Sequence, residues 1–181
     1  YTGLVTLVQL SACVLGDKNK MSYDAGISYI KNVLEATRTL QQHPDDLDAR
    51  GIIMMGASLS TSSRIGIGKE ESFAYDIYEL EFLPEKLFGS PYRRSLTAVF
   101  PRFLCAMGKH HPKEVEKYYL DAFGFDSSIE DSSRKLIELF SNLGIEMFYD
   151  GQITRNQVDC IPCHTELDRE EIFDIINSLI Q

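Results

Sequence analysis

Hydrophobic residues recur along most of this chain at the three- and four-residue spacing of an amphipathic α-helix. Five segments show the repeat most clearly, and they cover residues 49–60, 96–107, 115–123, 129–140 and 172–180. No stretch alternates hydrophobic and polar residues over a useful length, as a half-buried strand would. The pattern predicts an all-α fold of about eight or nine helices, with residues 66–72, 84–91 and 145–167 the least regular.

The longest apolar run of the chain lies near its start. It extends from Leu4 to Leu15 and is interrupted by Thr6, Gln9 and Ser11. A helix needs roughly 20 predominantly apolar residues to cross a bilayer, and this run is shorter. It therefore predicts a helix buried in the core of a globular protein, and we expect no membrane partner.

Proline, glycine and acidic residues stand where helices should begin and end. Pro112 occupies a position that suits a first helical turn, and Gly124 and Gly144 come directly after helical repeats. Asp168 and Glu171 have the three-residue spacing of a capping box. These residues predict the boundaries of the helices in the second half of the chain.

The composition is that of a globular protein with an acidic balance. The chain has 181 residues, of which 44% are hydrophobic and 25% charged, with a formal net charge of -9. A chain of this length forms one hydrophobic core, so residues 1–181 are expected to be a single helical domain. Nucleic acids and anionic membranes select basic surfaces, and the net charge therefore argues against both as partners.

The cysteines indicate the compartment. Four cysteines are too few for a disulfide framework in a chain of this size, which favours a reducing, cytoplasmic environment. Cys13 and Cys105 lie among apolar residues and are expected to pack as small hydrophobic side chains.

One glycine pattern bears on nucleotide binding. The run GIGK at residues 66–69 resembles part of a phosphate-binding loop, but Ser63 and Glu70 stand where that loop needs a glycine and a Ser or Thr. No G-x-G-x-x-G occurs in the chain. It is therefore predicted to have no dinucleotide site and no cofactor of its own.

A catalytic set is hard to assemble from the sequence. The four histidines are His43, His110, His111 and His164. They fall at expected helix ends or in loops, where solvated residues are commoner than catalytic bases. Glu79 and Glu81 lie in a tyrosine-rich segment and are the best candidates for catalytic carboxylates.

The run Cys160-Ile161-Pro162-Cys163-His164 matches the attachment motif of a c-type haem. A haem also needs an exported context, a distal ligand and a pocket, and the sequence indicates none of these. Cys160 and Cys163 are alternatively a redox pair or a metal clip, although redox C-x-x-C pairs stand at a helix start after a strand. The favoured interpretation is a loop whose two cysteines are spaced by chance.

Three segments resemble the C-terminal helical domain of iron-containing alcohol dehydrogenases, especially the butanol dehydrogenase type. They read HPDDLDARGIIMMGASLS, YDIYELEFLPEKLFGSPYRRSLTAVFPRFLCAM and TELDREEIFDIINSLI. The resemblance implies the fold of the C-terminal half of this dehydroquinate synthase-like family. It also implies a parent protein whose N-terminal α/β domain binds NAD(P) and lies outside this chain, which fits a chain that begins with Tyr1 rather than Met.

The resemblance also implies where a metal site would lie. The family holds iron or zinc with an Asp and a His four residues apart on an early helix, with the first His of H-x-x-E-H and with the His of a later H-G. The last two positions are Tyr78 and Tyr92 here, and counting back from Pro44 places the early pair at Gly3 and Leu7. Such residues are poor ligands for a hard or borderline cation.

The remaining residues of that motif differ as well. Phe82 stands at the second His of H-x-x-E-H, and only Glu81 matches the family. The aromatic residues Tyr75, Tyr78, Phe82 and Tyr92 are expected to point inward and fill the cleft that held the metal.

These observations lead to one hypothesis and two rivals. The hypothesis is a helical domain without its metal site, which is non-catalytic by itself and acts as a scaffold, a regulator or a binding surface. The first rival is an active NAD(P)-dependent alcohol or aldehyde oxidoreductase, formed with the N-terminal domain, in which Glu81 and tyrosines donate protons. The second is a redox or metal-binding module that uses Cys160 and Cys163. Family members commonly associate, so a homo-oligomer is a further expectation.

Overall fold

The computed structural model describes residues 1–16, 19–62, 65 and 73–181, and the GIGK run lies outside them. The described residues form ten α-helices and one 3-10 helix, without a strand. In chain order these are α1 (Thr2–Val14), α2 (Lys20–Gln42), α3 (Leu47–Thr61), the 3-10 helix η1 (Phe73–Asp76), α4 (Ile77–Leu80), α5 (Phe82–Phe88), α6 (Tyr92–His110), α7 (Pro112–Phe123), α8 (Ile129–Asn142), α9 (Arg155–Asp159) and α10 (Arg169–Asn177).

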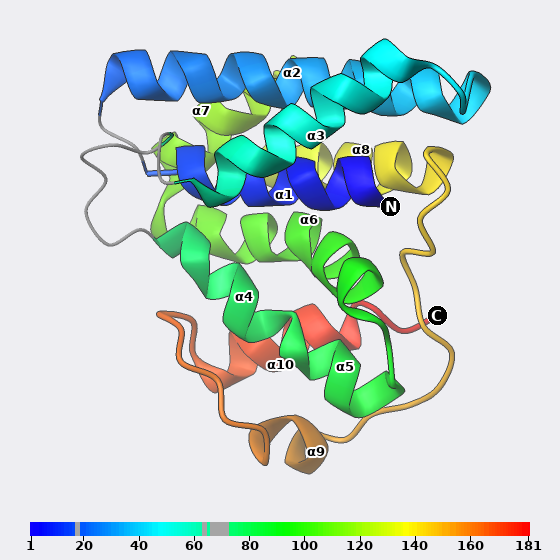
Figure 1. Cartoon of the computed structure of the whole chain (residues 1–181). Coiled ribbons are helices and arrows are strands. Elements are labelled where there is room, and N and C mark those ends of the chain that lie inside the picture. Colours follow the sequence, from blue (N-terminus) through cyan, green and yellow to red (C-terminus); the bar gives the residue numbers. More distant parts are fainter. Residues whose placement is uncertain (17–18, 63–64, 66–72) are drawn as a thin grey trace.

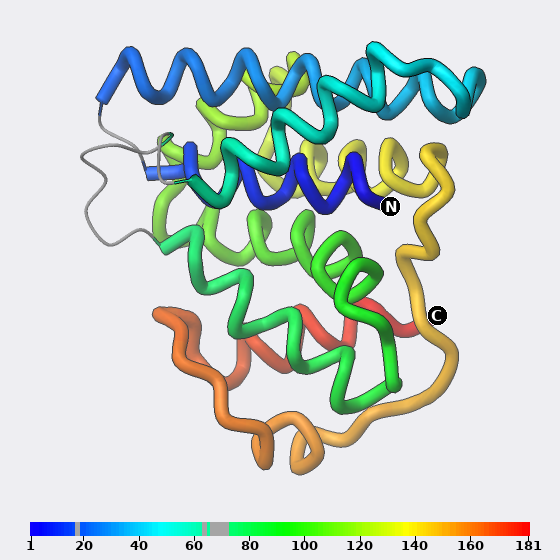
Figure 2. The backbone as a smooth tube through the Cα atoms, viewed as in Figure 1, coloured from blue at the N-terminus to red at the C-terminus, as the bar shows by residue number. Residues whose placement is uncertain are grey.

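The helices are stacked in layers around α1 and α6 (Figure 1). In this view α2 and α3 lie above α1, α6 lies below it, and α4, α5, α9 and α10 form the lowest part of the molecule. The chain passes from α8 to α9 through a long segment on the right, and both termini lie on that side (Figure 2). The predicted all-α class is confirmed, and the short helices α5 and α9 lie in stretches that the periodicity left irregular.

Helix α1 is buried as its apolar run predicts. Leu4, Leu7 and Leu10 are almost completely inaccessible to solvent, because α2, α3 and α6 all pack against this helix. In the described part of the chain, no helix has the length and apolar character needed to cross a membrane.

Gly56 permits the close approach of three helices. A Cβ atom at this position of α3 would lie 2.7 Å from a methyl group of Val33 on α2 and 3.1 Å from the methyl group of Thr6 on α1. The first distance is shorter than two carbon atoms tolerate, and the second is tighter than most carbon contacts. The absence of a side chain at Gly56 therefore sets the spacing of α1, α2 and α3.

The predicted helix ends are confirmed where caps mark them. The carboxylate of Asp168 accepts hydrogen bonds from the backbone N–H groups of Glu170 and Glu171 at 2.8 and 2.9 Å, and the Glu171 side chain returns a bond to the Asp168 N–H. Gly124 ends α7 with φ 72°, a left-handed conformation that glycine adopts without strain. Pro112 is in the first turn of the same helix.

The segment between α8 and α10 is held by Tyr149. Its ring stacks on Phe88 at 4.7 Å between centroids, its hydroxyl lies 2.8 Å from that of Ser90, and the guanidinium of Arg94 lies 4.2 Å from the ring centre. Its backbone N–H donates to the carbonyl of Leu179 at 2.7 Å. These contacts order a stretch with little helix of its own.

Candidate functional site

One face of α1 meets the start of α6 and the short helices η1 and α4. Gln9 and Cys13 lie one turn apart on this face. The amide of Gln9 donates a hydrogen bond to the phenol of Tyr92 in the first turn of α6. The Tyr75 hydroxyl bonds to the Cys13 thiol, and that thiol lies 3.4 Å from the carbonyl oxygen of Ser60. These contacts join α1, α3, η1 and α6 at one place.

Tyr78 and Glu81 complete this group of side chains. The ring of Tyr78 lies 6.3 Å from that of Tyr75, centre to centre. Tyr78 interacts electrostatically with Tyr92, Cys13 and Glu81, and Tyr92 also interacts with Glu81 and Glu85. The group that these contacts connect is called the tyrosine cluster below. It consists of Gln9, Cys13, Tyr75, Tyr78, Glu81 and Tyr92.

The phenols of the tyrosine cluster stay protonated at neutral pH. Burial is the main cause that raises the pKa of Tyr78, and the nearby Tyr92 adds to it. Burial also raises the pKa of Tyr92, while the hydrogen bond from Gln9 acts in the opposite direction. Because neutral phenols donate and accept hydrogen bonds, the cluster presents uncharged polar groups.

Glu81 is the most perturbed carboxyl group of the described chain. It stands between α4 and α5 with 2% of its surface exposed. Burial, followed by the neighbouring Glu85 carboxylate, raises its pKa to about 8. It hydrogen-bonds to Glu85, while its other carboxyl oxygen has no hydrogen-bond partner within the described residues. Glu81 is therefore largely a neutral acid at pH 7.

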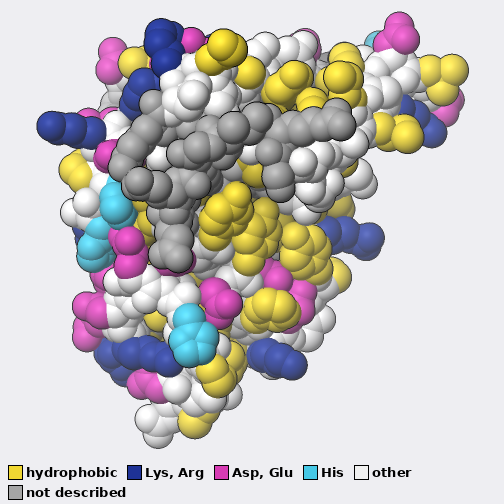
Figure 3. Space-filling model, turned by 60° about the vertical axis from the view of Figure 1, so that its left-hand side comes forward, with side chains coloured by type: hydrophobic (Ala, Val, Ile, Leu, Met, Phe, Trp, Pro, Cys, Tyr) yellow, Lys and Arg dark blue, Asp and Glu magenta, His cyan; other side chains and the backbone are white. Residues whose placement is uncertain are grey.

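The structure brings Tyr75, Tyr78 and Tyr92 together, but the expectation that the aromatic residues all point inward is wrong. Tyr75, Phe82 and Tyr92 expose 47%, 50% and 39% of their surface. The neighbouring Leu83 is fully buried, because α5 packs against the core through that face, and Phe82 is left at the solvent. Figure 3 shows exposed hydrophobic side chains gathered near the middle of one face of the molecule, with acidic side chains beside them.

The expected positions of the early metal-ligand pair, Gly3 and Leu7, are also corrected by the structure. A Cβ atom on Gly3 would lie 2.0 Å from the hydroxyl oxygen of Thr37 on α2 and 3.1 Å from Ile53 on α3. Gly3 therefore faces away from Tyr78 and Tyr92, and Leu7 is fully buried in the core. The residues of α1 that interact with these tyrosines are Gln9 and Cys13. Counting back from Pro44 missed them because the length of the connection between α1 and α2 cannot be read from a pattern.

The residues present do not fit the metal that the family resemblance implies. Among the residues that the structure describes, no three His, Cys, Asp or Glu side chains are grouped so that they could hold a metal ion. The tyrosine cluster offers neutral phenols, an amide, a thiol and a protonated carboxyl group. Iron and zinc sites need ionised carboxylates, thiolates or imidazoles.

Cys160 and Cys163 lack the surroundings of a reactive pair. Cys160 is exposed at the end of α9, whereas thiolates are stabilised at helix starts. Burial, with the carboxylate of Glu79 next in importance, raises the pKa of Cys163 to about 11. Glu79 itself accepts a hydrogen bond from the backbone N–H of His164 at 3.3 Å. Through this contact, Glu79 helps to hold the loop that contains His164.

Two of the histidines have partners that the sequence did not indicate. The imidazole of His110 lies 3.0 Å from the carboxylate of Glu171, and that of His111 lies 2.6 Å from Glu166. The ring of Phe73 stacks on His111 at 4.2 Å between centroids. Since each carboxylate is more than 50 residues away along the chain, no local pattern could have revealed that these histidines fasten the C-terminal segment.

Comparison with known proteins identifies the fold. No protein-family model matches the sequence, and no functionally curated protein matches it. The structure is similar to the NADH-dependent butanol dehydrogenase A of Thermotoga maritima, with a TM-score of 0.81, 15% identity, and coverage of 99% of this chain and 51% of that chain. A protein described as an alcohol dehydrogenase from Ralstonia eutropha gives a TM-score of 0.72, 16% identity, and coverage of 98% and 51%.

These similarities bear out the expected fold. The chain has the fold of the helical half of iron-containing alcohol dehydrogenases. It spans about half the length of each of the two similar structures.

Proposed function

We propose that this chain is the helical part of an alcohol dehydrogenase-like protein in which the tyrosine cluster has replaced the metal site, and that it binds a ligand or a partner without catalysing a reaction by itself. The observation that carries the proposal is the convergence of Gln9, Tyr78 and Tyr92. The resemblance places metal ligands at the two tyrosines, and the α1 residues that meet them are four apart, which is the spacing of the family's early pair.

The chemistry of the cluster supports binding through hydrogen bonds. The phenols and the amide are neutral donors and acceptors, and Glu81 is largely protonated at pH 7. A hydroxyl or carbonyl oxygen of a small neutral molecule can pair with such groups without desolvating a charge. Hydride transfer in the family relies on the metal to polarise the alcohol oxygen, so loss of the ligands removes that route.

Metal analysis tests this proposal. The parent protein, purified without chelators, is expected to contain no stoichiometric iron or zinc by mass spectrometry, and added metal should not stimulate NAD(P)-dependent alcohol oxidation. The proposal is wrong if one metal ion per chain is found and is lost in the Tyr78→Phe and Tyr92→Phe variants. Tyr29→Phe, which alters a tyrosine of α2 outside the cluster, is the matched control.

A second candidate function rests on Glu81. Its carboxyl group is protonated near neutral pH and one of its oxygens is buried without a partner, which are properties of a general acid. In a parent protein with a cofactor domain, Glu81 would hold the proton that an aldehyde oxygen needs when it is reduced. Activity that survives chelation and falls in Glu81→Gln would favour this candidate over the first.

The proposal includes partners for the chain. Because the similar structures are about twice as long, the first partner is an N-terminal nucleotide-binding domain of the same protein, and a second copy of the chain is the other. Cys160 and Cys163 have no role in this proposal, since burial opposes ionisation of Cys163.

A further inference from the structure

A cavity of about 380 Å³ lies between α6, α8 and α10, and none of its lining residues belongs to the tyrosine cluster. Its walls are largely apolar and include Ala106, Ile137, Phe148 and Ile175. Cys105, which is half-buried, and Arg102 also line it. The volume is in the range of sites that hold small organic molecules.

Arg102 places a buried positive charge at this cavity. Only 6% of the residue is exposed. Its Nε donates to the carbonyl of Ser178 at 3.2 Å, and its Nη1 donates to the carbonyl of Ala98 at 2.8 Å. The guanidinium carbon lies 4.9 Å from the centre of the Phe148 ring. These contacts fix the plane of the guanidinium and use two of its five N–H groups.

Within the described residues, only the Nε and Nη1 groups of Arg102 donate to an acceptor, and the group that acts on it electrostatically is the phenol of Tyr149 rather than a carboxylate. Burial lowers the pKa of Arg102 to about 10, so it remains charged at neutral pH. The Nη2 atom is not among the fully buried polar atoms that lack a partner, so it keeps contact with solvent. The guanidinium therefore has N–H groups that are free to donate to a ligand.

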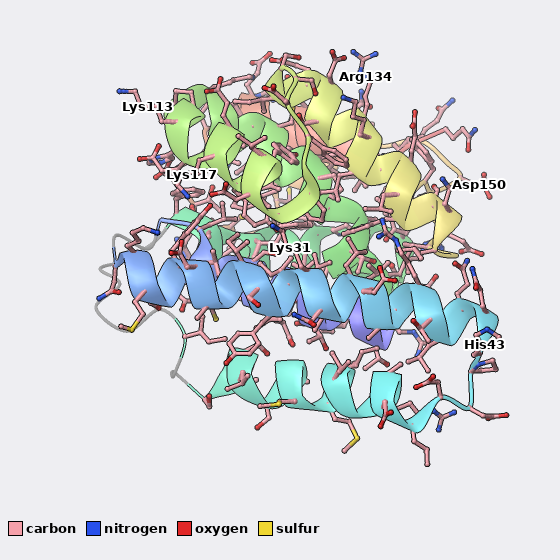
Figure 4. All side chains as sticks on the ribbon, turned by 90° about the horizontal axis from the view of Figure 1, so that it is seen from above. Lys31, His43, Lys113, Lys117, Arg134 and Asp150 are labelled. Atoms are coloured by element: carbon pink, nitrogen blue, oxygen red, sulfur yellow. The ribbon has the colours of Figure 1, made fainter. Side chains whose placement is uncertain are left out.

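The other charged residues around the cavity are engaged elsewhere or exposed. Glu171 pairs with His110 at 3.0 Å and lies 3.9 Å from Lys109. Arg134 pairs with Asp131. Figure 4 shows the side chain of Arg134 at the top edge of the view, where it points away from the helices. Glu130 and Asp174 also line the cavity, but both are exposed and neither forms an ion pair with Arg102. Arg102 is thus the buried cation of the cavity.

We propose that this cavity binds a small organic carboxylate with an apolar body. A carboxylate accepts two hydrogen bonds from one guanidinium, which matches the N–H groups that Arg102 retains. The apolar walls then cover the hydrocarbon part of the ligand and gain from its removal from water. An inorganic anion such as phosphate would satisfy the charge but leave these walls uncovered.

Calorimetric titration of the purified protein tests the site with octanoate as the probe. Saturable binding of octanoate is expected, with octan-1-ol and inorganic phosphate each at least about tenfold weaker, because each retains only one of the two interactions. The variant Arg102→Met keeps most of the length of the side chain. It should weaken the binding of octanoate at least about tenfold and leave the binding of octan-1-ol unchanged. Equal binding of octanoate and octan-1-ol, or unchanged octanoate binding in the variant, would overturn the proposal.

A second measurement uses the unaltered protein, since Arg102→Met removes two structural hydrogen bonds and can fail to fold. Cys105 lines the cavity, whereas Cys160 is exposed in the distant loop after α9. Octanoate is expected to slow the modification of Cys105 by methyl methanethiosulfonate and to leave the rate at Cys160 unchanged. If octanoate slows neither thiol or slows both equally, the cavity does not hold it.

Discussion

The side chain of Gln9 donates a hydrogen bond to the phenol of Tyr92 and so joins α1 to the first turn of α6. One turn further along α1, Cys13 meets Tyr75 and lies near Tyr78. This pairing defines which face of α1 belongs to the tyrosine cluster. Substitution of these residues by metal ligands therefore tests whether the tyrosine cluster occupies the position of a metal site.

Introducing the family's metal ligands into the tyrosine cluster should create a metal site. The variant that combines Gln9→Asp, Cys13→His, Tyr78→His and Tyr92→His is expected to bind one Zn²⁺ per chain, because it supplies an ionised carboxylate and three imidazoles at one place. Equilibrium dialysis followed by metal analysis measures the gain over the unaltered protein.

The matched control for that variant retains both Tyr→His changes but carries Gly3→Asp and Leu7→His on α1. It should not bind Zn²⁺, since Gly3 faces Thr37 and Ile53. Thermal unfolding of the control shows whether it is folded. If this control gains a site and the first variant does not, the assignment of Gln9 and Cys13 is wrong.

Glu81 should make the protein less stable as the pH rises. Its pKa is raised from 4.5 to about 8, so the folded state keeps a proton that the unfolded state has lost. Between pH 4.5 and 8 the free energy of unfolding should therefore fall as pH rises, by on the order of a few kcal/mol, and become level above pH 8.

Urea unfolding at pH 5 and pH 8 checks this dependence. The variant Glu81→Gln cannot ionise and should lose most of the difference between the two pH values. Glu138→Gln, which alters an exposed carboxylate on α8, should retain it. An equal pH dependence in Glu81→Gln and in the unaltered protein would exclude the raised pKa.

Two glycines of α3 should respond in opposite directions to alanine. Gly56→Ala places a methyl group 2.7 Å from Val33 and is expected to lower the free energy of unfolding by about 1–3 kcal/mol through overpacking. Gly51 has no atom within 4 Å of an added Cβ, so Gly51→Ala should raise stability by up to about 1 kcal/mol through helix propensity. Chemical unfolding of both variants measures the contrast, and a loss of stability in both would contradict it.

The adjacent tyrosines Tyr118 and Tyr119 should also differ. The buried hydroxyl of Tyr118 lies 2.5 Å from that of Ser11 on α1, whereas the Tyr119 hydroxyl is buried without a hydrogen-bond partner among the described residues. Tyr118→Phe is expected to lower the free energy of unfolding by about 1–2 kcal/mol, because it breaks a buried hydrogen bond. Tyr119→Phe should lower the free energy of unfolding by less, or raise it. Thermal unfolding of the two variants measures the difference. A larger cost for Tyr119→Phe would show that its hydroxyl is satisfied.

The sequence by itself determined the helices and the fold they form. The repeats at residues 49–60, 96–107 and 129–140 are local, since residues three and four apart share one face of a helix whatever surrounds it. The same holds for the capping box of Asp168 and Glu171, in which both partners lie within one helical turn. Local signals of this kind are legible without coordinates.

Only the tertiary structure decided which side chains meet. It turned Gln9 and Cys13 toward Tyr92 and Tyr75, where counting had suggested Gly3 and Leu7. The helical repeat gave no reason to expect the exposure of Phe82, the burial of Glu81 or the unpaired charge of Arg102. Each depends on segments that are distant in the chain and on loop lengths, and the free energy of those contacts is fixed by packing in three dimensions rather than by neighbours in sequence.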